Sequence, residues 1–325
     1  MADIVSDLRK RIRKEGPLSF RDYMEEVLRF YYASRRNPIG MGGDFYTSAD
    51  LDPIFGQLLA RQFAEWAAEF ASFTIVELGA GKGLLARTIL KHCRFPYVIL
   101  ERSPAMRSRQ ELLLKGYNVD WIDELPTGLT GCIFSNEFFD ALPVHRVVHR
   151  DGVLKEIYLN ENFEEVEGEL QEPIDAPLEE GQIADINLEA RHWIRRIAAS
   201  LEHGYHVAID YGYLRDEFYA QPRGTLMCYW HHQAVENPYI RIGDQDMTAH
   251  VNFSDLIDEG IEASLEAVRF TTQMDYLVGL GILDEIAKLA NAGDATSMER
   301  LVKIKRLILP GNMGERFKVL VQTKR

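Results

Sequence analysis

A glycine-rich turn between a strand pattern and a helix pattern constrains the fold of this chain more than any other feature. Residues 73–78 form a short apolar run rich in β-formers, and residues 84–93 can form a helix. Between them lies Gly79-Ala80-Gly81-Lys82-Gly83. Glycines here permit a tight turn and let the backbone approach a ligand closely, and a helix N-terminus favours an anionic group. The turn therefore predicts a nucleotide-type cofactor at the edge of an α/β sheet.

The spacing of the glycines argues against two common nucleotide motifs. The dinucleotide fingerprint has a glycine or alanine five positions after its first glycine, and counting from Gly79 this place holds Leu84. The triphosphate-binding loop has serine or threonine after its lysine, whereas Gly83 follows Lys82. A glycine-rich turn with no ligand is the structural alternative.

The rest of the chain continues the pattern of buried strands and helices. Apolar runs that suit further strands lie at residues 97–100, 118–122, 132–135, 205–211 and 317–322. Runs that are apolar throughout and are separated by helices are typical of a parallel sheet buried on both faces. Two stretches depart from this rhythm: a hairpin pattern centred on Asp151-Gly152, and two amphipathic helix patterns at residues 277–290 and 298–309.

An acidic residue before alternate glycines, together with an acidic end to the second strand, resembles class I S-adenosyl-L-methionine-dependent methyltransferases. Glu77 and Glu101 are these two residues. The loop amides suit the methionine carboxylate of this cofactor, Glu77 can help neutralise its ammonium or sulfonium charge, and Glu101 can accept hydrogen bonds from both ribose hydroxyls. The predicted cofactor-binding residues are Asp44, Tyr46, Thr47, Glu77, Gly79, Ala80, Gly81, Gly83, Glu101, Arg102, Ser103, Asp120, Trp121, Ile122 and Asn136.

The expected fold is α/β, of the class I methyltransferase (Rossmann-like) type, with a seven-stranded, mostly parallel sheet. Residues 1–72 are expected to form an N-terminal helical cover that carries a lid loop at 40–48, and residues 73–325 the methyltransferase core. The core is expected to hold two insertions, a β-arm with an acidic segment at about 144–187 and a helical insertion at about 276–312.

The predicted acceptor side follows the fourth core strand, because ligands of open parallel sheets bind at the carboxyl ends of the strands. Asn136 and Phe139 resemble the polar-x-x-aromatic element with which amino-methylating enzymes hold a planar nitrogen. Glu137 and Asp140 add two carboxylates, which a guanidinium can satisfy with bidentate hydrogen bonds. Asn136, Glu137 and Asp140 are therefore the candidate catalytic residues, although Asp140 equally suits a role in bracing the loop. Phe139 and Tyr211 are the candidate substrate-binding residues.

Composition and charge exclude several other classes. The chain has 46% apolar and 27% charged residues, which is typical of a globular protein. Its net charge of −13 gives no basic footprint for nucleic acid, and no apolar stretch is long enough for a membrane span. Twelve acidic residues and no Lys or Arg lie between Lys155 and Arg191, which suits either a solvated hairpin or a basic partner.

Cysteines and histidines predict no metal site. The three cysteines are widely spaced, and the histidine pairs come with no HExxH or cysteine cluster. Asp3 and Asp7 do not suit a secretory or mitochondrial targeting signal, so a cytoplasmic location is expected. The polar segment at residues 243–253 is a candidate substrate loop.

Five segments together resemble the MidA-like family, whose mitochondrial members are assembly factors of respiratory complex I. The matching segments are Gly43-Asp44-Phe45-Tyr46-Thr47-Ser48, Val76 to Gly83, Asn136 to Val144, Asp246 to Phe253, and Asn312 to Phe317. The resemblance implies a protein arginine as methyl acceptor and, as partner, a subunit of an NADH:quinone oxidoreductase. The chain has Ala80-Gly81-Lys82 where members often have Pro-Gly-Arg, and residues 160–187 match nothing in the family.

The sequence therefore predicts an S-adenosyl-L-methionine-dependent N-methyltransferase that modifies arginine in a protein. One alternative is a non-catalytic assembly chaperone that keeps the cofactor fold and clamps its partner with the acidic arm and the helical insertion. A second alternative is a methyltransferase for a small molecule or a glutamine amide. The sequence does not give the oligomeric state.

Overall fold

The computed structural model describes residues 3–34 and 47–325, and its centre is a mixed sheet. Seven strands follow the order β15, β16, β10, β5, β2, β3, β4. In this order they are Glu266–Thr272, Phe317–Lys324, Leu201–Tyr213, Leu129–Asn136, Thr74–Leu78, Tyr97–Leu100 and Val119–Ile122. β16 is antiparallel to both neighbours, and the pairs from β10 to β4 are parallel. The expected seven-stranded, mostly parallel sheet is confirmed. A two-residue strand, β14 (Val251–Asn252), pairs with β10 outside this order.

The strand order reverses at β2, which lies between β3 and β5. The chain leaves β2 through α5 (Leu84–His92), forms β3, passes through α6 (Pro104–Leu113) to β4, and then returns to β5 on the other side of β2. Ligands of open α/β sheets bind where the strand order reverses, at the carboxyl ends of the strands. The glycine-rich turn and the segment after β5 both begin at this edge.

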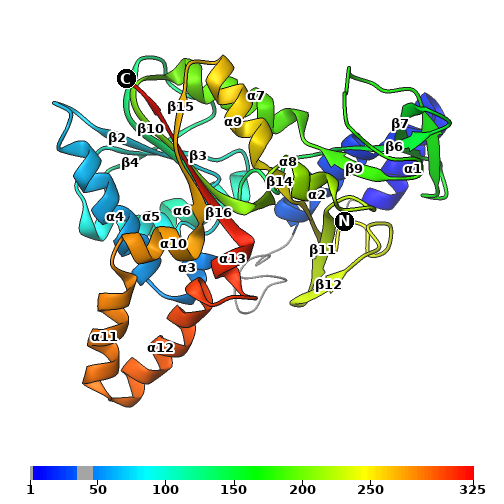
Figure 1. Cartoon of the computed structure of the whole chain (residues 1–325). Helices are drawn as coiled ribbons and strands as arrows, with labels where there is room; N and C mark the ends of the chain where they lie inside the picture. The colour runs from blue at the N-terminus through cyan, green and yellow to red at the C-terminus, as the bar shows by residue number, and fades with distance from the viewer. Residues whose placement is uncertain (1–2, 35–46) are drawn as a thin grey trace.

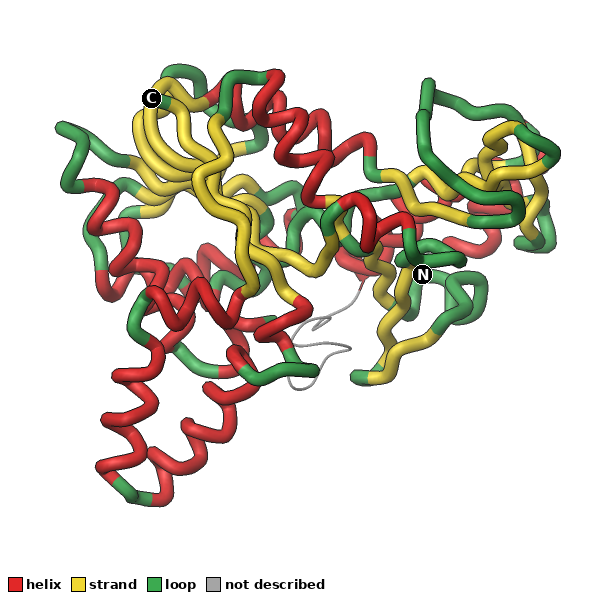
Figure 2. Tube along the Cα trace, in the orientation of Figure 1, coloured by secondary structure: helices red, strands yellow, loops and turns green. Residues whose placement is uncertain are grey.

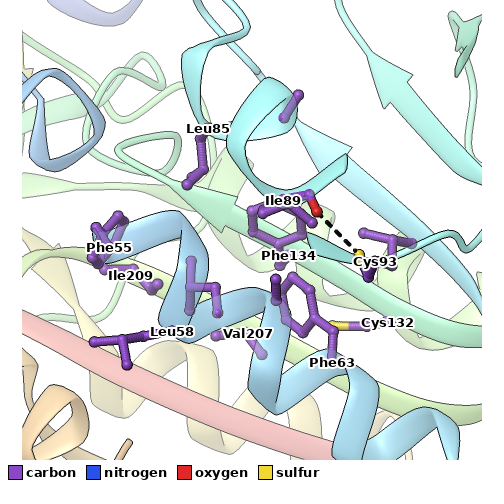
Figure 3. Packing of buried hydrophobic residues seen from close by; sticks show 14 of the residues in the cluster. Phe55, Leu58, Phe63, Leu85, Ile89, Cys93, Cys132, Phe134, Val207 and Ile209 are labelled. Carbon is purple, nitrogen blue, oxygen red and sulfur yellow. Dashed lines mark hydrogen bonds between the residues drawn. The ribbon is translucent and has the colours of Figure 1, made fainter. Parts of the chain in front are cut away.

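Helices cover both faces of the sheet (Figures 1 and 2). α4 (Ile54–Ala67), α5 and α10 (Gln273–Gly279) pack on one face, and α7 (Leu188–Ser200) and α9 (Phe253–Glu262) pack on the other. Figure 3 shows how the first face is filled by large apolar side chains. Those it labels include Phe55, Leu58 and Phe63 of α4, Leu85 and Ile89 of α5, Phe134 of β5, and Val207 and Ile209 of β10.

The three cysteines are separate buried thiols, Cys93 and Cys132 within this packing and Cys228 in the neighbouring apolar cluster around residues 20–28. The thiol of Cys93 donates to the carbonyl of Ile89 at 3.3 Å, at the last turn of α5 (Figure 3). Burial raises the pKa of the Cys93 thiol to about 11. A thiol of this kind packs as a small apolar group and is a poor nucleophile.

A separate sheet forms the arm that extends beyond the core strands (Figure 1). Its strands are β6 (His145–Arg150), β7 (Val153–Leu159), β8 (Glu165–Gly168) and β9 (Ile183–Ile186), with β1 (Leu18–Ser19) paired to β7. Asp151 and Gly152 both have left-handed φ values, 54° and 78°, and Arg150 pairs with Val153. The predicted two-residue hairpin is therefore confirmed, because both central residues of such a turn need positive φ.

The N-terminal helices join this arm to the core. α2 (Phe20–Ser34) begins where the amide of Asp22 donates to Ser19 Oγ at 3.2 Å. α1 (Ile4–Glu15) and α2 bury Leu8, Tyr23 and Val27 against Leu159 of the arm and Met247 of a small third sheet. The two helices therefore hold the arm, the small sheet and the core together.

The helices α10, α11 (Ile282–Ala292) and α12 (Ala295–Ile308) lie between β15 and β16, and α11 and α12 project away from the sheet (Figure 1). α13 (Met313–Arg316) then leads into β16. The prediction of one helix over residues 277–290 is wrong. Gly281 has a φ of 90°, which ends the helical path after α10 and starts a new helix at Ile282.

Several short elements have no counterpart in the sequence prediction. They include α3 (Ser48–Leu51), α8 (Arg215–Tyr219), β11 (Leu226–Trp230), β12 (Gln233–Val235) and β13 (Asp246–Ala249). The longer strand β15 of the core sheet was not predicted either. β11 to β13 form the small third sheet, and every residue of β13 is buried. The prediction of a substrate loop at 243–253 is therefore wrong for Asp246–Ala249, which is a packed strand. Among the described helices, none is long and apolar enough to cross a membrane.

Candidate active site

A cavity of about 520 Å³ lies at the carboxyl ends of β2, β3 and β5. α2 forms the opposite wall with Leu28, Arg29 and Tyr32. Ten of the predicted site residues line it. They are Thr47, Glu77, Gly79, Ala80, Gly81, Glu101, Arg102, Ser103, Asn136 and Glu137. Asp44 and Tyr46, which were predicted to close over the cofactor, lie outside the described residues.

The glycine-rich turn forms the floor of this cavity with its backbone. Gly79, Gly81 and Gly83 have φ values of 64°, 53° and 79°, in the left-handed region that favours glycine. The amide of Gly79 donates to the carbonyl of Leu100 at 3.0 Å, which ties the turn to the end of β3. A Cβ on Gly79 would lie 2.9 Å from the ring of Phe138. The turn therefore requires glycine both for its path and for the space above it.

Glu77 supplies a buried carboxylate at the end of β2. Its side chain lines the cavity and accepts a hydrogen bond from the hydroxyl of Tyr97 at 2.7 Å. The pKa of Glu77 is raised to about 8, mainly by burial and to a smaller extent by the charge of Glu101, while the hydrogen bond from Tyr97 acts in the opposite direction. Within the described residues Glu77 forms no ion pair. A cationic group that entered the cavity here would stabilise the ionised carboxylate.

Glu101 ends β3 and is held from both sides. Its Oε1 accepts from the amide of Ser103 and its Oε2 from Nε2 of Gln110, each at 2.9 Å. Burial raises the pKa of Glu101, and these two donors oppose the shift. Gln110 was not predicted as a site residue. The sequence held one indication of its role. Gln110 lies four residues from both Met106 and Leu114, which are buried, so helical spacing places a polar side chain on the buried face of the helix.

Lys82 is a second functional candidate that sequence reasoning did not select. Its ammonium forms an ion pair with Asp50 of α3, and both residues line the cavity. The neighbouring Asp52 binds Arg300 of α12 through two hydrogen bonds of 2.8 Å. Segment 47–52 therefore connects the glycine-rich turn to the helical insertion, a link between distant parts of the sequence that no local pattern indicates.

The acceptor side of the cavity begins with Glu137, directly after β5. Its backbone has a left-handed φ of 56°, and its amide donates to the carbonyl of Ile209 at 2.9 Å. Its carboxylate accepts from Nδ2 of Asn136 at 2.8 Å and from the amide of Ser48 at 3.3 Å. An unfavourable backbone conformation of this kind persists only where the surroundings enforce it, and such residues cluster at functional sites.

Asp210 of β10 holds the loop that follows Glu137. Its Oδ2 accepts from the amides of Phe138, Phe139 and Asp140, at 3.2, 2.9 and 3.3 Å. Burial raises the pKa of Glu137 and of Asp210 well above their ordinary values, with repulsion from Asp140 adding to both shifts. Burial also raises the pKa of Asp140, to about 7. Three carboxyl groups therefore lie close together behind the acceptor side, and of these only Glu137 lines the cavity.

The same three hydrogen bonds decide which phenylalanine faces the cavity. Phe138 lines it, whereas Phe139 is fully buried against Val76, Ile133 and other residues under α7. The expectation that Phe139 lies against a substrate is therefore not met by this structure, because the loop directs its ring into the core. Asp140 is also buried and does not line the cavity, and among the described residues its Oδ1 has no hydrogen-bond partner.

The other predicted residues lie near the cavity without lining it. Tyr211 packs against His250 and Phe317. Trp121 lies on β4 beside Asp120 and Ile122, and its indole N–H donates to Oε1 of Gln110 at 3.0 Å. Gly83 packs over Gln110 at the start of α5. Within the described residues, no group of three or more His, Cys, Asp or Glu side chains could hold a metal ion.

The fold and the site together define a class I methyltransferase: a glycine-rich turn, two acidic strand ends and an acceptor loop surround one cavity at the reversal of strand order. Residues 58–271 match the model of the Methyltransf_28 family of S-adenosyl-L-methionine-dependent methyltransferases, and the chain belongs to this family. The predicted MidA-like resemblance is confirmed by relatives that share most of the chain's length.

Two curated relatives are the mitochondrial protein arginine methyltransferases NDUFAF7 of Rattus norvegicus and Homo sapiens. The rat protein is 28% identical over 94% of this chain and 81% of its own length, and the human protein is 27% identical over 94% and 80%. A crystal structure of a Burkholderia thailandensis protein bound to S-adenosyl-homocysteine is 29% identical, with a TM-score of 0.91 over 99% of this chain and 92% of that chain. The cofactor is therefore S-adenosyl-L-methionine.

The residues present fit this cofactor. Gly79 and Gly81 of the glycine-rich turn contribute only backbone to the lining of the cavity, which suits a carboxylate. Glu77 offers a buried carboxylate without an ion-pair partner in the described chain, which suits an ammonium or sulfonium group. When bound, the cofactor supplies an electrophilic methyl group on a sulfonium.

Proposed function

We propose that the chain transfers this methyl group to a nitrogen of an arginine side chain in a protein. The observation that carries the proposal is Glu137, a carboxyl group that lines the cavity next to the buried Asp140 and whose pKa is raised by burial and by repulsion from Asp140. Buried carboxylates of this kind are stabilised by a cation with several N–H donors. A guanidinium is such a cation, and the NDUFAF7 relatives are named protein arginine methyltransferases.

In this proposal Glu137 orients the acceptor. Its carboxylate faces the cavity between Asn136 and Ser48, so an ionised Glu137 can accept hydrogen bonds from a guanidinium and polarise one nitrogen. Asn136 contributes an Oδ1 that has no partner among the described residues and can accept a further N–H. Asp210 keeps the loop in place through its three backbone hydrogen bonds. Phe138, Leu142 and Pro143 give this side an apolar lining that excludes water.

The same proposal assigns the cofactor side. The turn from Gly79 to Gly83 holds the methionine carboxylate, Glu77 its charged end and Glu101 the ribose hydroxyls. The adenine then lies toward β4, near Asp120, Trp121 and Ile122. The protein partner from an NADH:quinone oxidoreductase and the cytoplasmic location stay predictions of the sequence.

The substitution Glu137→Gln tests the acceptor role. We expect a loss of transfer to an arginine-containing peptide of about 10- to 100-fold, because orientation and polarisation of the nitrogen act mainly in the transition state. Affinity for S-adenosyl-homocysteine, measured by calorimetry, should change less than threefold, or about 0.7 kcal/mol. Glu124→Gln, at an exposed carboxylate away from the cavity, is the matched control.

The product identifies the acceptor class. Incubation with labelled S-adenosyl-L-methionine and bacterial lysate, followed by mass spectrometry, should place the methyl group on arginine nitrogens. Label on a glutamine amide or on a low-mass product would contradict the arginine proposal. Equal turnover of Glu137→Gln and the unaltered protein would remove Glu137 from the mechanism.

A further inference from the structure

We infer that Gln110 is a positioning residue of the cofactor site, which holds the glycine-rich turn, Glu101 and Trp121 in fixed relative positions. The side chain reaches all three from α6. Its Nε2 donates to the carbonyl of Gly81 at 2.8 Å and to Oε2 of Glu101 at 2.9 Å, and its Oε1 accepts from the indole N–H of Trp121 at 3.0 Å. The inference rests on the proposed roles of Glu101 toward the ribose and of Trp121 beside the adenine.

The chemistry of a carboxamide suits this junction. The amide group has two N–H donors on nitrogen and an acceptor oxygen, and all three functions are used here. An ionised glutamate has no donor to offer, and an apolar side chain has neither donor nor acceptor. Gln110 is fully buried, so water cannot replace a lost partner easily.

The position of Gln110 beneath the turn is a second, independent observation. A Cβ placed on Gly83 would lie 3.4 Å from Cγ of Gln110, so the side chain packs against the turn where a larger residue at 83 would stand. Gly83 also has a left-handed φ of 79°. Gly83 therefore matters in two ways: it allows the left-handed backbone of the turn, and its missing side chain leaves space for Gln110.

Gln110 acts on Glu101 by donating to one of its carboxylate oxygens while the amide of Ser103 donates to the other. Both hydrogen bonds favour the ionised carboxylate, which burial disfavours. The charged groups on the surrounding elements are Glu77 of β2, Lys82 of the turn with its partner Asp50, and Arg102, whose guanidinium lies over Trp193.

Two substitutions at Gln110 should weaken S-adenosyl-homocysteine binding with opposite dependence on pH. Gln110→Met removes a donor from Glu101, so the pKa of Glu101 rises, and affinity relative to the unaltered protein should fall as pH is lowered from 8 to 6. In Gln110→Glu a protonated carboxyl can still donate to Glu101, so the relative affinity should fall as pH is raised over the same range. At its less favourable pH, each variant should bind about 10- to 100-fold more weakly, as expected for loss of a hydrogen bond to a charged group.

The experiment is calorimetric titration of the full chain with S-adenosyl-homocysteine at several pH values, with the ratio of variant to unaltered protein taken at each pH. This affinity ratio cancels the effect of pH on Glu77 and on the ligand, because that effect is the same in the variants and in the unaltered protein. Gln62→Glu is the matched control, because Gln62 donates to Glu65 at 3.1 Å on the exposed face of α4, away from the cavity. Its affinity ratio should stay near one at every pH.

A measurement without ligand tests the contact with Trp121. The chain has four tryptophans, so four indole N–H signals are expected in a nitrogen-15 correlation spectrum, and Trp121→Phe assigns one of them. Gln110→Met should shift that signal and speed its hydrogen exchange, whereas Gln62→Glu should leave it unchanged. This readout does not depend on the cofactor.

Three outcomes would overturn the inference. The first is a pH-independent loss of affinity in both Gln110 variants, which would indicate packing alone. The second is unchanged affinity in both while Glu101→Gln binds weakly, which would keep the ribose role of Glu101 and remove Gln110 from it. The third is unfolding of both variants without ligand, which would make Gln110 a folding residue. If Glu101→Gln itself binds normally, the proposed placement of the ribose has failed instead.

Discussion

The two sides of the cavity satisfy their carboxylates in opposite ways. On the cofactor side, Glu77 and Glu101 each receive hydrogen bonds from uncharged donors that the protein supplies, including Tyr97 and Gln110. On the acceptor side, burial raises the pKa values of Glu137, Asp140 and Asp210, and the charge of Asp140 raises those of Glu137 and Asp210 further. Buried oxygens of Asn136 and Asp140 have no partner within the described chain. The carboxylates of the cofactor side are therefore satisfied within the protein, whereas the acceptor side keeps buried oxygens for which the described residues supply no donor.

The largest expected effect comes from breaking the cofactor side at Gly79. In Gly79→Val a side chain would occupy a left-handed backbone position and lie within 3 Å of the Phe138 ring. We expect affinity for S-adenosyl-homocysteine to fall about 100-fold or more, measured by calorimetry. Gly116→Val is the control, because Gly116 has a φ of 93° with nothing within 4 Å of the new Cβ. Normal binding by a folded Gly79→Val protein would contradict the assigned role of the turn.

A smaller effect, confined to the acceptor side, is expected for Asp210→Asn. A neutral amide oxygen is a weaker acceptor for three backbone N–H groups than a carboxylate, so the loop that carries Glu137 should lose order. We expect methyl transfer to an arginine peptide to fall about tenfold, which corresponds to ~1.4 kcal/mol, with cofactor affinity nearly unchanged. Asp216→Asn changes an exposed aspartate and serves as the control. Equal losses of affinity and turnover would show that the two sides are not independent.

The smallest expected effect is a pH dependence of ligand affinity on the cofactor side, which arises from Glu77. The pKa of Glu77 is about 8, so the carboxylate ionises as pH rises from 6.5 to 8.5, and attraction for a cationic ligand group grows over this range. Affinity for S-adenosyl-homocysteine should therefore rise severalfold with pH, and the rise should be absent in Glu77→Gln. Calorimetry at fixed ionic strength measures both curves. If the affinity of Glu77→Gln still rose with pH, the pH dependence would come from a group other than Glu77.

The sequence was sufficient for the parts of the fold that depend on local pattern. The strand at Tyr97–Leu100 and the helix from Leu84 were predicted closely, because uninterrupted apolar runs and a glycine-rich start are strong local signals. The Asp151-Gly152 hairpin was predicted because few residue pairs tolerate two positive φ values. The break at Gly281 was missed, since a single glycine inside an amphipathic pattern does not show whether the helix continues.

The parts of the site that the sequence did not reveal depend on distant contacts. Neighbouring phenylalanines 138 and 139 are chemically equal, and only the hydrogen bonds from their amides to Asp210, about seventy residues away, direct one to the cavity and the other to the core. The role of Gln110 likewise depends on hydrogen bonds to three residues on other elements, which the local sequence does not indicate. Small strands such as β11 are stabilised by pairing with segments that follow them at irregular distances, so periodicity gave no signal for them.

The place of β16 in the sheet has a consequence for how the chain is made. β15 leaves the ribosome first, yet it joins the sheet only through β16, which lies between it and β10. Until residues 317–324 emerge, after the four helices α10 to α13 have been synthesised, β10 and β15 each present an unpaired edge. Open strand edges invite pairing with other chains. During this interval the nascent protein therefore presents edges on which another chain could pair, and β16 closes both of these edges at once.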